Sequence, residues 1–156
     1  YLREEMPLGT AGALSLLSET PLEPILVLNG DLLTDLDFSA LVDYHESMDC
    51  VATQCVRDYV DQVPFGVVKC EKGYVVGMEE KPVQRLLVNA GIYVISPNLL
   101  AHIGIGTPST MPDLLLKALG QGDKVAGFPI HERWTDIGRL EDYCWARDNW
   151  SFNEEK

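Results

Sequence analysis

The feature that most constrains this fold is a short apolar run at residues 25–28 that ends abruptly in Asn29-Gly30-Asp31. Four consecutive apolar residues are too few for a helix. They are typical of a strand covered on both faces, as in an α/β sheet flanked by helices. The ligand crevice of such open sheets lies just beyond the carboxyl ends of the strands. The run therefore predicts an α/β protein with Asp31 at a strand exit.

Asp31 has two interpretations from this stretch alone. Gly30 allows the backbone to turn or to approach a ligand closely. The carboxylate that follows suits a hard cation such as Mg²⁺, which one or two carboxylates typically hold together with substrate phosphates. The alternative is a turn aspartate that bonds only to its own backbone.

Length and charge limit the classes of function. The chain has 156 residues, the size of one ordinary domain, so we expect a single α/β domain over residues 1–156. No apolar run approaches the roughly 18 residues of a membrane span. The formal net charge of −12 disfavours binding to nucleic acid or to anionic membranes. A phosphate ligand would then depend on a metal ion and a few placed cations.

The four cysteines show no zinc-like spacing with one another or with the three histidines. Cys50 and Cys70 lie in apolar, strand-like contexts. We interpret the cysteines as buried free thiols, which fits a reducing cytoplasm.

Apolar periodicity predicts alternating strands and helices along the chain. After the first strand, Phe38, Leu41, Val42 and His45 recur at helical spacing, with a start near Asp37 or Ser39, and residues 51–56 return as a strand. This is a βαβ pattern, in which His45 is expected to be a surface or packing residue. Further strands are expected at 65–70, 74–78, 88–95 and 124–130, and helical segments at 98–103, at 111–119 and beyond Leu140. The strands at 65–70 and 74–78 should form an antiparallel hairpin. The fold class is a Rossmann-like, mixed and mostly parallel sheet flanked by helices.

The segment at residues 7–13 begins the chain's first helix, with Thr10 as the expected N-cap. Gly9 and Gly12 leave little side-chain cover there, so that a phosphate or a flat base could lie against the backbone. The alternative is a helix start made of small residues because it packs closely on the sheet.

Three more segments place polar groups at element boundaries. Lys81 follows a strand and is stiffened by Pro82, which cannot continue a ladder. Asn89 opens a strand with small residues, as if something fits against it. Asp136 lies at another boundary, and if it meets Asp31 the two form a two-carboxylate metal site suited to phosphate chemistry. Lys81 would then supply a compact cation for a second phosphate. The alternative is that Lys81 is one of a run of solvated surface charges.

The order and spacing of these motifs resemble the sugar-1-phosphate nucleotidylyltransferases, and most closely the mannose-1-phosphate guanylyltransferase-like branch. The matching segments are Pro-Leu-Gly-Thr-Ala-Gly-Ala at 7–13, Asn-Gly-Asp at 29–31, Phe-Gly-Val-Val at 65–68, Glu-Glu-Lys-Pro at 79–82, Asn-Ala-Gly-Ile-Tyr at 89–93 and Trp-Thr-Asp-Ile-Gly-Arg-Leu-Glu-Asp-Tyr at 134–143.

The resemblance implies a Mg²⁺-dependent reaction in which a hexose 1-phosphate attacks the α-phosphorus of a nucleoside triphosphate, with GTP favoured, and releases pyrophosphate. It implies metal binding by Asp31 and Asp136, and a contact between Lys81 and the sugar phosphate. The implied substrate-binding residues are Leu8, Gly9 and Thr10 beside the base, and Gly66, Glu80 and Asn89 near the sugar. Such transfer depends mostly on positioning and charge neutralisation.

One departure from the family pattern concerns the start of the chain. Family members begin with a strand and a glycine-rich loop that carries an arginine, followed by a lysine, and no such segment occurs here. We expect this chain to be the downstream part of a nucleotidylyltransferase, inactive alone, with an exposed sheet edge or face that could promote homo-oligomers.

Two alternatives share much of this evidence. One is a noncatalytic homologue that binds a sugar nucleotide and regulates a partner, and the other is a thymidylyltransferase or another base specificity within the family. Retention of Asp31, Asp136 and Lys81 favours an enzyme. A receiver-like or generic nucleotide-binding domain does not explain the Glu-Glu-Lys-Pro and Asn-Ala-Gly segments.

Overall fold

The apolar run forms strand β1 (Ile25–Leu28) at one edge of a four-stranded sheet, in a computed structural model that describes residues 2–151. The strand order is β1-β6-β3-β7, with β6 at Val83–Ile95, β3 at Ala52–Gln62 and β7 at Val125–Pro129. β6 is antiparallel to both of its neighbours, and β3 is parallel to β7. The mixed sheet of the α/β prediction is confirmed, although two of the three strand pairings are antiparallel and the sheet is therefore not mostly parallel in its pairing, because β6 runs between β1 and β3.

Helices cover both faces of this sheet. One side carries α3 (Met111–Gly120) and the short helices α1 (Gly9–Gly12), η1 (Ala13–Leu16) and η2 (Pro97–His102), and the other carries α2 (Phe38–Ser47). Alternation along β6 divides the core, since Tyr93 and Ile95 belong to the α3 side and Ile92 and Val94 to the α2 side. All four side chains are fully buried. β6 is thus covered on both faces, whereas the side chains of β1 are only partly buried and Leu28 is 41% exposed, because β1 lies at an edge of the sheet.

Local signals explain where the longer helices begin. The Asp37 side chain accepts hydrogen bonds from the backbone N–H groups of Ser39 and Ala40 at the start of α2. Thr110 caps α3 in the same way, through the N–H of Asp113. The last helix, α4, spans Leu140–Asn149. None of the helices in the described part of the chain is both long and apolar enough to span a membrane.

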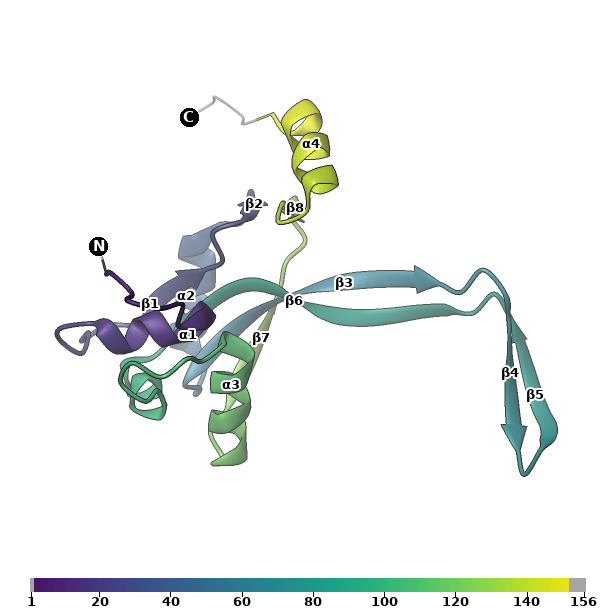
Figure 1. Cartoon of the computed structure of the whole chain (residues 1–156), viewed down its shortest axis with the longest axis horizontal. Coiled ribbons are helices and arrows are strands. Elements are labelled where there is room, and N and C mark those ends of the chain that lie inside the picture. Colours follow the sequence, from purple (N-terminus) through teal and green to yellow (C-terminus); the bar gives the residue numbers. More distant parts are fainter. Residues whose placement is uncertain (1, 152–156) are drawn as a thin grey trace.

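The distal halves of β3 and β6 leave the body as a two-stranded ribbon, which continues into the hairpin of β4 (Gly66–Glu71) and β5 (Tyr74–Glu80) (Figure 1). We call residues 57–88 the arm. The hairpin turns at Lys72 and Gly73, whose φ values of 49° and 88° fit the two-residue turns that join twisted strands. The antiparallel hairpin is confirmed, whereas the ribbon that carries it is longer than predicted.

Two local predictions need correction, and a third is confirmed. Cys70 is exposed rather than buried, because both faces of β4 are open to solvent, and only Cys55 of the four free thiols is fully buried. Thr10 does not cap α1, since Leu8 occupies that position and the Thr10 hydroxyl accepts from the backbone N–H of Met111. The expectation that His45 is a surface or packing residue is confirmed, since it is 3% exposed and its ring bonds to Thr53 and Ser96.

Candidate functional site

A small second sheet brings two distant parts of the chain together at the end of β1. It pairs β2 (Leu32–Thr34) with β8 (Trp134–Asp136) in antiparallel register, with Leu32 opposite Asp136. Immediately beside this pair, the backbone N–H of Ile137 donates to the carbonyl of Asp31 at 2.8 Å. Asp31 and Asp136 therefore lie on adjoining backbones, although 105 positions separate them in the sequence.

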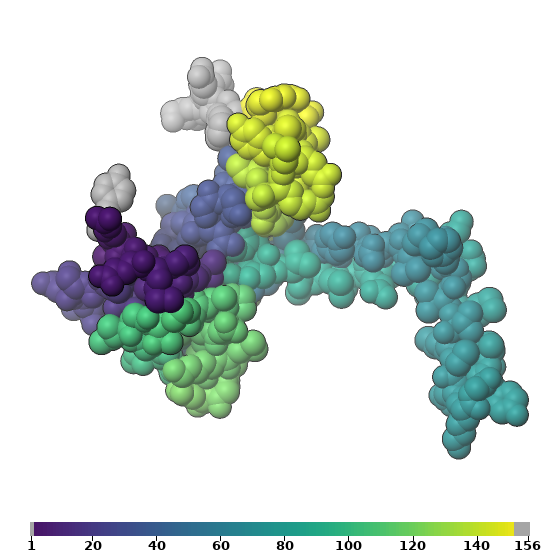
Figure 2. Space-filling view, viewed as in Figure 1, coloured from purple at the N-terminus to yellow at the C-terminus, as the bar shows by residue number. Residues whose placement is uncertain are grey.

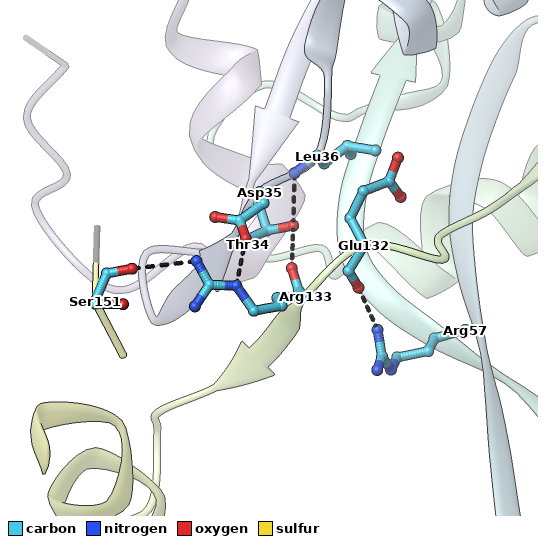
Figure 3. A network of polar contacts seen from close by, with 7 residues as sticks. All are labelled: Thr34, Asp35, Leu36, Arg57, Glu132, Arg133 and Ser151. Atoms are coloured by element: carbon cyan, nitrogen blue, oxygen red, sulfur yellow. Dashed lines mark hydrogen bonds and ion pairs between the residues drawn. The ribbon is translucent and has the colours of Figure 1, made fainter. Parts of the chain in front are cut away.

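A polar network holds the far end of this small sheet in place (Figure 3). The Arg133 carbonyl accepts from the backbone N–H of Asp35 and from the Thr34 hydroxyl, while its guanidinium bonds to the carboxylate of Asp35 and to the Ser151 carbonyl. Arg57, at the base of the arm, donates to the carbonyl of Glu132 at 2.8 Å. These contacts fix the register that places the two aspartates side by side.

Gly138 marks the point where both carboxylates meet. A Cβ atom built on this glycine would lie 2.9 Å from Oδ2 of Asp31 and 3.0 Å from Oδ1 of Asp136. The two oxygens can be no farther apart than the sum of these distances. Oδ1 of Asp136 also accepts the backbone N–H of Gly138 at 2.8 Å, which orients that carboxylate. Only a residue without a side chain leaves room for both groups.

This arrangement fits a Mg²⁺ ion bound jointly with phosphates. Both carboxylates are exposed, and both direct an oxygen to the same side of Gly138. Within residues 2–151 there is no cluster of three or more His, Cys, Asp or Glu side chains suited to a metal. Mg²⁺ commonly takes one or two carboxylates and completes its octahedron with water and substrate phosphate oxygens. Two carboxylates therefore suit Mg²⁺ better than a metal that takes all of its ligands from the protein.

The Asn-Ala-Gly segment of β6 lies against the Asn-Gly-Asp segment. Gly91 has a φ of 71°, and a Cβ there would lie 2.7 Å from Nδ2 of Asn29. Asn29 in turn donates its backbone N–H to the Gly91 carbonyl at 2.9 Å. The small residue at 91 is therefore needed because Asn29 fits against it.

Asn89 also lies in this region, on the same strand as Gly91. Its side chain accepts the backbone N–H of Gly91 and donates to the phenol of Tyr93 at 2.6 Å. Burial raises the pKa of Tyr93, so the phenol stays protonated and the bond from Asn89 orients the amide. The amide has two N–H groups and two lone pairs, which is enough to serve a ligand as well.

An open pocket of about 370 Å³ joins this region to the start of the chain. Its lining residues are Thr10, Asn29, Gly30 and Asp31. The structure thus brings one of the three predicted base-contacting residues, Thr10, to the same depression as Asp31. The pocket lies beyond the end of β1, where the apolar run predicts a ligand crevice.

The glycines at 9 and 12 are explained by close packing. Gly9 has a φ of 76°, and a Cβ there would lie 2.7 Å from the Ser109 carbonyl oxygen. The same oxygen accepts the backbone N–H groups of Ala11 and Gly12, at 2.9 and 3.1 Å. Leu8 is buried beside them. Two of the N–H groups that a phosphate would need are therefore already hydrogen-bonded. This supports the interpretation of a close-packed helix start. The packing partner is the loop at Ser109, however, and not the sheet.

Lys81, Glu80 and Gly66 lie together, but away from the two aspartates. Gly66 pairs with Glu80 across β4 and β5, and the backbone N–H of Lys81 donates to the Phe65 carbonyl. This hairpin occupies the far end of the arm, remote from β2 and β8 (Figure 1). Lys81 has a φ of 48°, in the left-handed region that costs a lysine roughly 1–2 kcal/mol. Such backbone strain is more frequent at functional positions. The contact between Lys81 and the sugar phosphate stays a prediction.

Sequence reasoning assigned no role to Gly138, Asn29 or Arg133. The signal for Gly138 was present, since a glycine two residues after an aspartate suits a side-chain-to-backbone turn. Asn29 could have been inferred from the small residues that fit against it. Arg133 gave no signal, because its partners Asp35 and Ser151 are distant in sequence.

Comparison with known proteins places this chain within a family. The profile of the family described as nucleotidyl transferase matches residues 1–151. The chain is 32% identical over 150 residues to the mannose-1-phosphate guanylyltransferase catalytic subunit beta of Drosophila pseudoobscura pseudoobscura, covering 92% of this chain and 40% of the relative. It is 30% identical over 149 residues to the protein of the same name from Dictyostelium discoideum, covering 92% and 41%. The chain thus spans about 40% of the length of these relatives.

Solved structures support the same fold. The structure of HddC from Yersinia pseudotuberculosis complexed with GMP-PN aligns with a TM-score of 0.62 at 22% identity, over 95% of this chain and 65% of that one. With the family profile matching nearly the whole sequence, the chain belongs to the nucleotidyl transferase family.

Proposed function

We propose that the whole protein is a nucleotidyltransferase that joins a nucleoside monophosphate from GTP to a hexose 1-phosphate such as mannose 1-phosphate, with Mg²⁺ as cofactor. The observation that carries the proposal is the convergence of the Asp31 and Asp136 carboxylates on Gly138 at the exit of β1. The guanylyltransferase names of the relatives favour this sugar and base over the thymidylyl alternative.

In the proposed reaction, an oxygen of the sugar phosphate attacks the α-phosphorus of the triphosphate. A new P–O bond forms, the bond between the α-phosphorus and the bridging oxygen breaks, and that oxygen leaves with pyrophosphate. Bound Mg²⁺ would supply charge neutralisation for the phosphates. Both substrates are anionic and the chain has a net charge of −12, so local cations decide whether they bind at all.

The chain's own residues would divide the remaining tasks. Asp31 and Asp136 would hold the metal, and the Gly138 N–H would keep Asp136 oriented. Lys81 would bind the sugar phosphate as a compact cation, with Glu80, Asn89 and Gly66 near the sugar. Thr10, with Leu8 and Gly9, would lie beside the base.

Covalent catalysis by a buried thiol does not compete with this mechanism. Burial, reinforced by the charge of Glu132, raises the pKa of Cys55 to about 12, which keeps the thiol protonated and inert. All four cysteines are free, which supports a reducing cytoplasm as the proposed location.

The proposal is tested by measuring pyrophosphate release by the whole protein across pairs of nucleoside triphosphates and sugar 1-phosphates, with and without Mg²⁺. We expect the largest kcat/KM for GTP with mannose 1-phosphate, and loss of turnover on chelation. Binding of a sugar nucleotide without release from any pair would favour the noncatalytic regulator instead.

A further inference from the structure

A second pocket lies between the base of the arm and α4, and it shares no lining residue with the pocket beside Asp31. Its volume is about 240 Å³, and all three tryptophans of the chain line it. Arg57 comes from β3, Arg133 and Trp134 from the start of β8, and Trp145 and Trp150 from α4 and its C-terminal end. Figure 2 shows α4 (yellow) beside the base of the arm (teal).

The pocket offers a flat aromatic surface to a ligand. The guanidinium of Arg57 lies over the Trp134 ring at 5.8 Å, and that of Arg133 lies over the Trp150 ring at 4.5 Å. Trp145 is 55% exposed, so its ring is open to a further flat group, which would stack on it. A cationic ligand is disfavoured, because two guanidinium groups already lie against the aromatic rings.

Arg57 supplies a cation that no carboxylate of the described residues neutralises. Its hydrogen bond goes to the Glu132 carbonyl, and the Glu132 carboxylate points away from it (Figure 3). Arg133, by contrast, is paired with Asp35. No ion pair within residues 2–151 involves Arg57. A guanidinium has five N–H groups in a planar fork that matches a carboxylate. In a chain of net charge −12, this cation marks a place for an anion.

The indole N–H of Trp150 lacks an acceptor. Among residues 2–151, its nitrogen is the only buried side-chain nitrogen or oxygen atom without a hydrogen-bond partner. The indole N–H of Trp134 is satisfied, since it donates to the Ala90 carbonyl at 2.9 Å. An unsatisfied buried donor costs free energy, which a ligand with an acceptor oxygen would recover.

The volume limits the size of the ligand. Pockets for drug-sized ligands measure roughly 300–1,000 Å³, and this pocket is smaller. It therefore suits a compound of one or two rings with a single anionic group. A nucleotide, with its base, sugar and phosphates, is too large for it.

We propose that this pocket binds a small aromatic carboxylate. The aromatic ring of the ligand stacks on Trp145, and its carboxylate accepts hydrogen bonds from Arg57. The N–H of Trp150 is a further donor for the carboxylate. This binding is separate from the proposed transfer reaction and does not depend on it.

The probe is 2-naphthoate, titrated into the whole protein by isothermal titration calorimetry. We expect saturable binding of one molecule for each chain. The neutral amide of the same shape, 2-naphthamide, should bind about tenfold more weakly or worse, because it loses the charge-assisted hydrogen bonds to the guanidinium. An excess of GMP should not displace 2-naphthoate, because a nucleotide does not fit this pocket.

Variants separate the two parts of the recognition. Arg57→Gln should remove the preference for the carboxylate, so that 2-naphthoate and 2-naphthamide bind equally. Trp145→Ala should weaken both compounds about tenfold or more. It should leave the unfolding midpoint in urea unchanged, since the side chain is exposed. Trp145→Phe should restore part of the affinity.

Arg147→Gln is the matched control, because Arg147 is an exposed arginine of α4 that does not line the pocket. It should leave both affinities unchanged. Absence of saturable binding, equal affinity of the wild type for acid and amide, or displacement by GMP would each overturn the proposal. Wild-type affinity for 2-naphthoate in Arg57→Gln or in Trp145→Ala would overturn it as well.

Discussion

Gly138 lies where the two carboxylates of the candidate site converge. The two carboxylate oxygens that lie nearest to it would both be within about 3 Å of an added methyl group. Real Cβ atoms essentially never approach oxygens so closely, so a side chain would push at least one carboxylate away. The residue itself is exposed, and nothing in the core depends on it.

Gly138→Ala should therefore impair function rather than folding. We expect kcat/KM for pyrophosphate release to fall at least tenfold, which corresponds to about 1.4 kcal/mol of transition-state stabilisation. The unfolding midpoint in urea should change little. The matched control is Gly120→Ala, where an added Cβ meets nothing within 4 Å. Equal activity of the two variants would contradict the placement of the site at Gly138.

Lys81 can be tested against a second lysine of the same hairpin. Lys72 has nearly the same backbone conformation, with φ values of 49° and 48° for the two residues, and lies at the opposite end of β5. Lys81→Ala should raise the KM for the sugar phosphate about 10- to 100-fold, since a hydrogen bond to a charged group contributes roughly 1.5–3 kcal/mol. Nucleotide affinity should stay nearly the same.

Lys72→Ala is the control and should leave both constants unchanged. Lys81→Arg should restore little of the affinity for the sugar phosphate, because a planar guanidinium does not replace a compact ammonium group. If Lys81→Ala leaves the sugar-phosphate KM at the wild-type value, Lys81 belongs to a solvated run of charges.

At the scale of elements, α2 is attached to the sheet by a buried polar cluster. His45 reaches Thr53 on β3 at 2.9 Å and Ser96 after β6 at 3.0 Å. Burial lowers the pKa of His45 below its usual 6.5, and the charge of Glu46 offsets part of this effect. The folded state therefore holds the ring neutral, whereas the unfolded chain protonates it at higher pH.

This cluster should make stability depend on pH in a defined direction. Between the lowered pKa of folded His45 and 6.5, the unfolded state binds more protons, so the free energy of unfolding falls as pH decreases from 6.5. His45→Gln should remove that part of the pH dependence. Urea unfolding of both proteins at pH 7.5 and pH 5.5 checks this, and an equal loss of stability in wild type and variant would show that His45 does not titrate on unfolding.

The sequence predicted elements best where one face is buried. Periodicity found α2 and α3 and the strands that cross the core, because burial imposes the pattern. It missed the length of the arm and the exposure of Cys70, since both faces of a ribbon in water carry no such pattern. Thr10 was predicted as a cap from the N-cap preference of threonine. That local preference cannot reveal that the Met111 N–H, 101 positions away, binds the hydroxyl instead.

At the scale of the whole molecule, the candidate site is divided between the body and the arm. The aspartate pair and the pocket beside Thr10 belong to the body, whereas Lys81 and Glu80 belong to the arm, where the hairpin of β4 and β5 joins the ribbon of β3 and β6. The motifs predicted all of these residues but not their separation, which depends on how the ribbon bends. If Lys81 acts on the same phosphates, the arm must approach the body during turnover.

The most direct test of the account compares Asp31→Asn, Asp136→Asn and the double variant in the whole protein, by steady-state pyrophosphate release with GTP and mannose 1-phosphate in Mg²⁺. Because the two carboxylates act as one unit, each single change should lower kcat/KM at least 100-fold, and the double change should cost little more. Asp61→Asn, on the arm, should retain wild-type activity. Wild-type turnover in either single variant would contradict the central claim that Asp31 and Asp136 together form the metal site of a nucleotidyltransferase.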